Sequence, residues 1–146
     1  MDVDVDFVAE LIFIASSLAY ALCGLLFVLL GYVVMDWLTP GKLGELIFVQ
    51  RNRNAAAVTA SNIAAVGLIV AMSIVQSAER FAKGIVTLTG YGIVGIAILA
   101  LAFKILDWVT PGRLGDLVTD PEPHPAVWIT VAGNFAIGIT IAASIS

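Results

Sequence analysis

Two carboxylates with matching neighbours are the strongest candidates for chemistry in this chain. Asp36 and Asp107 each begin the element Asp-Trp-x-Thr-Pro-Gly-x-Leu-Gly, and a basic residue, Lys42 or Arg113, follows inside it. A carboxylate near a membrane boundary can belong to an ion or proton site. It can equally lock a turn, either by pairing with the basic residue or by accepting hydrogen bonds from free backbone N–H groups. The sequence leaves both interpretations open.

The residues that follow each aspartate predict the start of a short helix. Threonine accepts a hydrogen bond from a backbone N–H at the N-cap position, and proline suits the first helical position. Because Leu43, Leu46 and Ile47 follow at helical spacing, we expect an interfacial helix whose apolar side faces the acyl chains. The residues of this predicted elbow are Thr39, Pro40 and Gly41 in the first element and Thr110, Pro111 and Gly112 in the second.

Polar residues inside apolar segments form a second candidate set. Asn62 recurs as Asn134, and Tyr20 recurs as Tyr91. An amide below the headgroups needs a hydrogen-bond partner. One interpretation is an interhelical hydrogen bond, including one between the two asparagines themselves, worth about 0.6–2 kcal/mol. The other is a polar site lining a cavity.

The remaining reactive residues predict no catalytic or metal chemistry. The only histidine, His124, has prolines on both sides, and the only cysteine, Cys23, lies in an apolar run, so neither has the partners that a metal or redox site needs. We find no nucleophile–base pair, phosphate-binding loop or dinucleotide motif. We therefore expect no enzymatic activity, no cofactor and no metal. The net charge of −4 also argues against nucleic-acid binding.

These candidate residues are carried by an internal duplication. Residues 36–47, DWLTPGKLGELI, recur as residues 107–118, DWVTPGRLGDLV, at an offset of 71. Such repeats dictate architecture. We expect residues 1–78 to form one two-span repeat and residues 79–146 the second, together making one compact membrane domain.

Composition requires that much of the chain faces lipid. It is 60% hydrophobic and 12% charged, whereas a soluble domain carries about 25% charged residues. Four segments reach the roughly 20 apolar residues that a membrane span needs. We therefore predict an all-α membrane protein with four transmembrane helices in two parallel-oriented repeats, related by a pseudo-twofold axis along the membrane normal. The predicted spans are 11–35, 55–77, 84–106 and 126–145. Small residues at helical spacing in the second span, which predict close packing, are Ala60, Ala64, Gly67 and Ala71.

The distribution of basic residues predicts the orientation. Five of the seven lie in or beside the repeated elements, and the positive-inside rule places such loops in the cytoplasm. We expect a multi-pass protein of the bacterial cytoplasmic membrane with both termini outside.

The duplicated element resembles a known family. Asp-Trp-x-Thr-Pro-Gly-x-Leu-Gly, followed by a polar stretch and an asparagine-bearing helix of small residues, is similar to the bacterial inner-membrane proteins grouped as Domain of Unknown Function 350. The resemblance implies a two-span unit, occurring singly or duplicated, and brings no catalytic residue or cofactor. Genes of envelope stress and of ATP-grasp-like ligases accompany members of that family, which implies a membrane partner. The copies differ in one place, where QRNRNAA of the first becomes DPEPHPA in the second.

Two functions remain in view. The first is a membrane scaffold or complex subunit without chemistry of its own, forming homo-oligomers or binding a membrane-protein partner. The second is a small oligomeric channel or transporter with a polar site at Asn62 and Asn134.

Overall fold

The chain folds into four long helices joined at one end by short helical elbows. The computed structural model describes residues 7–76, 81–109 and 114–145. The long helices are α1 (Phe7–Leu38), α2 (Arg53–Val75), α3 (Phe81–Val109) and α5 (Val127–Ile145), and the elbows contain the π-helical η1 (Glu45–Val49) and α4 (Leu114–Thr119). All four long helices are apolar and long enough to cross a membrane. Four spanning helices at the predicted places are therefore confirmed, although residue 77 of the predicted span 55–77 lies outside the described residues. No strand occurs in the described ranges.

The helix lengths follow from the apolar runs and from local stop signals. At 1.5 Å per residue, the 32 residues of α1 extend about 48 Å, which exceeds the roughly 30 Å of hydrocarbon in a bilayer. The chain turns sharply after α1 at Gly41, whose φ of +91° is the left-handed conformation that glycine adopts without a steric cost. Asn52 then caps α2, because its side-chain oxygen accepts a hydrogen bond from the backbone N–H of Ala55.

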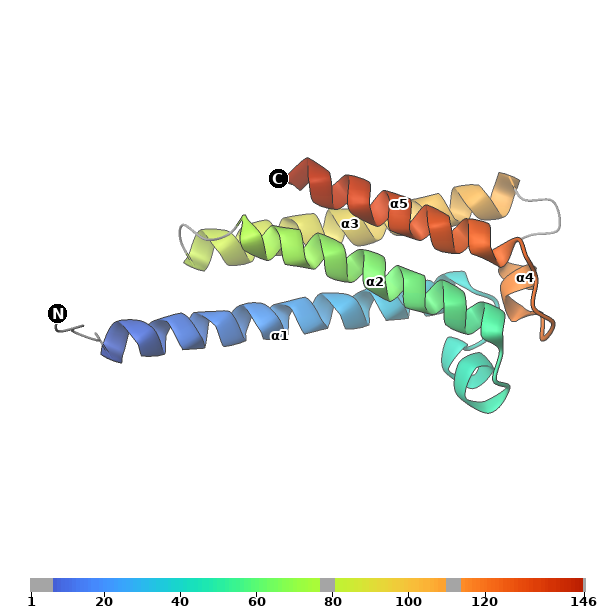
Figure 1. Cartoon of the computed structure of the whole chain (residues 1–146), viewed down its shortest axis with the longest axis horizontal. Helices are drawn as coiled ribbons and strands as arrows, with labels where there is room; N and C mark the ends of the chain where they lie inside the picture. The colour runs from blue at the N-terminus through green and yellow to red at the C-terminus, as the bar shows by residue number, and fades with distance from the viewer. Residues whose placement is uncertain (1–6, 77–80, 110–113, 146) are drawn as a thin grey trace, which may run out of the picture.

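Both elbows lie at one end of the molecule, and the start of α1 and the end of α5 lie toward the other (Figure 1). α2 occupies the centre of the bundle, in contact with α1, α3 and α5. It is the most buried of the four long helices, and α1 is the least buried. The elbows are therefore neighbours, and α2 holds the two halves of the chain together.

The two halves do not obey the twofold relation that the repeat led us to expect. α3, from the second half, packs against α2, but the equivalent pair α1 and α5 makes no comparable contact. A twofold axis would give both pairs the same interface. Each half instead uses different faces to contact the other. The predicted boundary at 78/79 falls outside the described residues.

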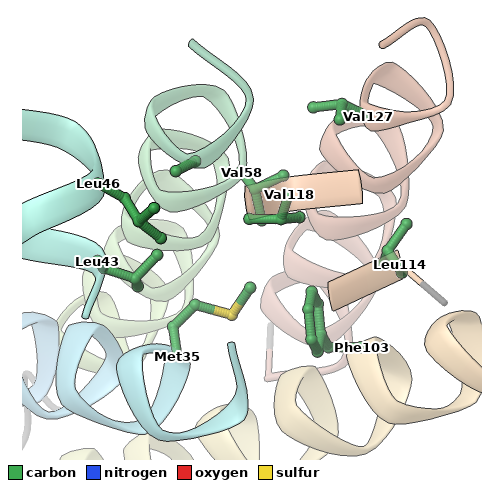
Figure 2. Close-up of a cluster of buried hydrophobic side chains, with 9 residues drawn as sticks. Met35, Leu43, Leu46, Val58, Phe103, Leu114, Val118 and Val127 are labelled. Carbon is green, nitrogen blue, oxygen red and sulfur yellow. The ribbon is translucent and has the colours of Figure 1, made fainter. Parts of the chain in front are cut away.

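The elbows are held by a hydrophobic cluster at their end of the bundle (Figure 2). Leu43 and Leu46 of the first elbow and Leu114 and Val118 of the second are all buried. They converge with Phe103 of α3. The prediction that the apolar side of the elbow helix faces the acyl chains is therefore wrong, since these leucines complete a protein core. Phe48 and Val49, on the other side of η1, are 81% and 74% exposed.

Candidate functional site at the elbows

The repeated aspartates hold the elbow backbone in place. Oδ1 of Asp36 accepts a hydrogen bond from the backbone N–H of Leu43 at 2.6 Å. Oδ1 of Asp107 accepts one from the N–H of Gly115 at 2.8 Å. A carboxylate at the end of a long helix opposes that helix's dipole, but here it also meets free N–H groups at the start of the next helical segment, where negative charge is favourable. Of the two kinds of partner expected for Asp36, the structure therefore provides the backbone N–H group.

Thr39 ends a helix, and it does not begin one. Its hydroxyl donates a hydrogen bond to the backbone oxygen of Met35 at 3.0 Å, and its backbone N–H donates to the same oxygen. The helical segment of the elbow begins only at Leu43. The prediction of Thr39 as an N-cap is wrong, because the side chain satisfies the last turn of α1. Thr110, Pro111, Gly112 and Arg113 lie outside the described residues.

Pro40 of the first elbow packs directly against the second elbow. A Cβ atom built on Gly115 would lie 2.8 Å from Cδ of Pro40, so only glycine fits there. Beside this contact is an open pocket of about 280 Å³. Its lining includes Trp37, Thr39, Pro40, Lys104, Asp107 and Asp116. The structure thus brings Thr39 and Pro40 together with Asp107, but Asp36 does not line this pocket. Within the described ranges, no group of three or more His, Cys, Asp or Glu residues could hold a metal ion.

Two asparagines of the first half fasten the second elbow. Nδ2 of Asn52 donates to the backbone oxygens of Thr119 and Asp120 at 3.0 and 2.9 Å. Nδ2 of Asn54 lies within hydrogen-bond distance of three backbone oxygens, the shortest contact being 2.7 Å to Glu122. Both side chains are more than nine-tenths buried. We call this set of hydrogen bonds the asparagine clasp.

The side chain of Asn54 also accepts a hydrogen bond from the segment that leads into α5. Oδ1 of Asn54 accepts a hydrogen bond from the backbone N–H of His124 at 3.2 Å. Nδ1 of His124 in turn accepts one from the N–H of Ala126. The single histidine therefore shapes the turn before α5. It also lines an open pocket of about 360 Å³ with Arg53 and Trp128.

The recurring polar residues inside the bundle bind helices to one another. Nδ2 of Asn62 in α2 donates to the backbone oxygen of Gly31 in α1 at 3.2 Å. Nδ2 of Asn134 in α5 donates to Oγ of Ser61 in α2 at 3.0 Å. The expected bond between the two asparagines is absent from these contacts, since each amide has its own partner. With exposed fractions of 5% and 2%, neither asparagine faces an open cavity.

The two tyrosines have different environments. The hydroxyl of Tyr20 donates to the backbone oxygen of Phe81 at 3.3 Å, which links α1 to α3, and the two rings form an edge-to-face pair 5.5 Å apart. Tyr91 is 41% exposed. The recurrence of tyrosine in the sequence therefore does not correspond to a shared role.

The comparison with protein families agrees with this architecture. Residues 6–145 match the model of the Domain of Unknown Function family DUF350. The chain belongs to this family.

Similar proteins occur in mycobacteria. A UPF0719 transmembrane protein of Mycolicibacterium paratuberculosis is 29% identical over 131 residues, covering 90% of this chain and 87% of the relative. A UPF0719 transmembrane protein of Mycobacterium bovis is 32% identical over 133 residues, covering 91% and 88%. No solved structure matches the chain. The relatives support an integral membrane protein and name no ligand or reaction.

Sequence reasoning missed the asparagine clasp of this DUF350 chain. Asn52 and Asn54 belong to the stretch in which the two copies differ. That difference was the available signal. The first copy supplies side-chain donors, and the proline-rich stretch of the second copy supplies backbone carbonyl oxygens that no helix uses.

Proposed function

We propose that this protein is an integral membrane scaffold, or a subunit of a membrane complex, that carries no chemistry of its own and works as an oligomer. We further propose that it resides in the bacterial cytoplasmic membrane with its elbows in the cytoplasm. The expected partners are a second copy of the chain or another membrane protein. The bilayer surrounds it in either case.

The use of its polar side chains is the observation that carries this proposal. Asn62 of α2 bonds to the backbone of α1, and Asn134 of α5 bonds to Ser61 of α2. Asp36 and Asp107 bond the backbone of the elbows. Groups that would bind a substrate or an ion in a transporter are thus engaged in holding helices together, as expected of a structural component.

The alternative is a small oligomeric channel with its polar site at Asn62 and Asn134. It requires these amides to face a water-filled path in the assembly. Their burial and their protein partners favour the scaffold instead. A flux assay in liposomes distinguishes the two, because a channel of this kind should lose conductance in the double variant Asn62→Leu and Asn134→Leu, whereas the scaffold should show no flux before or after the change.

The scaffold proposal is tested by the mass of the protein extracted with its native lipids. We expect particles that contain several copies of the chain or a second membrane protein. Particles containing one chain alone, obtained both from native lipid discs and from mild detergent, would contradict the proposal.

A further inference from the structure

Between the halves, a glycine of α5 lies directly against the backbone of an alanine of α2. A Cβ atom built on Gly138 would lie 2.8 Å from both Cα and Cβ of Ala65. α5 thus brings its backbone against α2 through a face of small residues. On the same pair of helices, Asn134 bonds to Ser61. These contacts define what we call the glycine face of α5 and the alanine face of α2.

The repeat places counterparts of Gly138 and Ala65 on the other helix of each pair, where both positions are open. At the offset of 71, Gly138 corresponds to Gly67 in α2, and Ala65 corresponds to Ala136 in α5. A Cβ atom on Gly67 would meet nothing within 4 Å, and Ala136 is exposed. The interface inside the chain therefore uses one glycine face and one alanine face, and it leaves one of each unoccupied.

Both free faces are built for close helix contact. The glycine face of α2 consists of exposed or half-buried small residues, and so does the alanine face of α5. The residues concerned are Ala60, Ala64, Gly67 and Ala71 in α2 and Ala132, Ala136 and Thr140 in α5. In lipid, where burial of apolar surface gives little driving force, such small residues permit the close backbone packing that associates helices.

We infer that the occupant of these faces is a second copy of this chain, joined head to tail. The alanine face of α5 in one copy packs on the glycine face of α2 in the next, so that Ala136 meets Gly67 as Ala65 meets Gly138 within the chain. This inference rests on the proposed oligomeric function and specifies its interface. A contact between unlike faces can be repeated from each copy to the next. The copies form a closed ring if the rotation between neighbouring copies brings the last one back to the first.

Charges at the elbows favour the same arrangement. Residues 39–53, which end at the first residue of α2, contain three basic residues and one acidic residue. Residues 110–126, which precede α5, contain one basic residue and three acidic residues. Head-to-tail packing of α2 on α5 sets the basic elbow beside the acidic elbow of the next copy. A symmetric α2–α2 contact would instead oppose two basic elbows, which is electrostatically unfavourable.

A pair of glycine substitutions tests this interface without disturbing the fold. Gly67→Leu fills the free glycine face. Gly90→Leu is the matched control, because a Cβ at Gly90 also meets nothing within 4 Å and Gly90 lies on an exposed helix surface. We expect Gly67→Leu to convert the native particles into lone chains with unchanged helix content, and Gly90→Leu to retain the wild-type mass. Equal masses for both variants and the wild type would overturn the inference.

Disulfide trapping in membranes provides an independent readout. In a Cys23→Ser background, Gly67→Cys and Ala136→Cys together should form, on oxidation with copper phenanthroline, a ladder of dimers, trimers and larger species. Each single-cysteine variant should remain monomeric on a denaturing gel, since unlike positions meet. The exposed pair Leu22→Cys and Leu101→Cys serves as the lipid-facing control. Dimers from Gly67→Cys alone would show a symmetric contact and overturn the head-to-tail arrangement.

The two levels of the proposal fail in different ways. If wild-type particles contain one chain and no partner, the oligomeric function itself is wrong. If wild-type particles contain several copies, but neither Gly67→Leu nor the cysteine pair affects or traps them, the assembly exists and uses another surface.

Discussion

The side-chain amide of Asn134 donates a hydrogen bond to the hydroxyl of Ser61, and that hydroxyl donates to the backbone oxygen of Val58. The relay crosses from α5 to α2 and joins the two halves of the chain in the interior of the bundle. All three residues are buried. When a buried polar group in such a relay of hydrogen bonds loses its partner, the folded state loses stability.

Breaking this relay should destabilise the bundle by a modest and measurable amount. Ser61→Ala removes the acceptor of Asn134, and we expect a loss of about 0.6–2 kcal/mol in unfolding free energy. Thermal unfolding in detergent measures it. Ser16→Ala is the control, because the hydroxyl of Ser16 bonds only to the preceding turn of its own helix. A larger effect at Ser16 than at Ser61 would contradict the role of the relay.

The elbow bond of Asp36 predicts a graded response to substitution. Asp36→Asn keeps an oxygen that can accept from the N–H of Leu43 but loses the charge, so it should cost about 0.3–1 kcal/mol. Asp36→Ala loses the acceptor as well and should cost about 0.5–2 kcal/mol. Urea or heat unfolding of both variants gives the order. If Asp36→Asn and Asp36→Ala both leave stability unchanged, the carboxylate does not lock the elbow.

Gly115 should tolerate no side chain, since its neighbour Pro40 is a rigid ring 2.8 Å from the position of a Cβ. We expect Gly115→Ala to cost about 1–3 kcal/mol through overpacking. Gly90→Ala, in open space on α3, should instead be neutral or stabilising by up to about 1 kcal/mol, because alanine favours the helix. Opposite signs in thermal unfolding are the expected result. Equal effects would mean that Pro40 moves aside.

The features that depend on a single segment of the chain could be predicted from the sequence. Apolar runs longer than a bilayer's thickness determine the four spans, and the placement of Asp36 and Asp107 at helix ends implied a compensating partner. The faces that meet between halves could not be obtained in this way. Gly67 and Gly138 occupy equivalent places in the repeat, yet only Gly138 touches another helix, because a copy-to-copy contact depends on relative rotation rather than on local pattern.

The sequence also could not predict which of several possible partners a side chain would contact. Thr39 fits the statistics of an N-cap, but its hydroxyl instead donates to the backbone oxygen of Met35 in the last turn of α1. Leu43 and Leu46 have the spacing of a lipid-facing stripe, yet the neighbouring elbow offers Leu114 and Val118 as protein partners. Amphipathic spacing identifies an apolar side without identifying what covers it.

The orientation in the membrane is testable with single cysteines in a Cys23→Ser background. By the positive-inside rule, Asp2→Cys should react with an impermeant maleimide in intact cells, and Gln50→Cys in the first elbow should react only after permeabilisation. Gln50 is exposed, so its protection in intact cells would reflect the membrane rather than burial. Labelling of Gln50→Cys from outside would reverse the assignment.

The asparagine clasp should hold the second elbow in place. Asn54→Asp keeps the oxygen that accepts from His124 but replaces the amide that donates to the backbone oxygens around Asp120 and Glu122. A carboxylate facing those carbonyl oxygens is repelled, so we expect residues 117–126 to detach and their amides to lose protection from hydrogen exchange by at least about tenfold, which corresponds to about 1.4 kcal/mol. Asn134, inside the bundle, should keep its protection. Uniform loss of protection across α2 and α5 would show that the asparagine clasp supports the whole fold. Unchanged protection at residues 117–126 would show that it does not hold the second elbow.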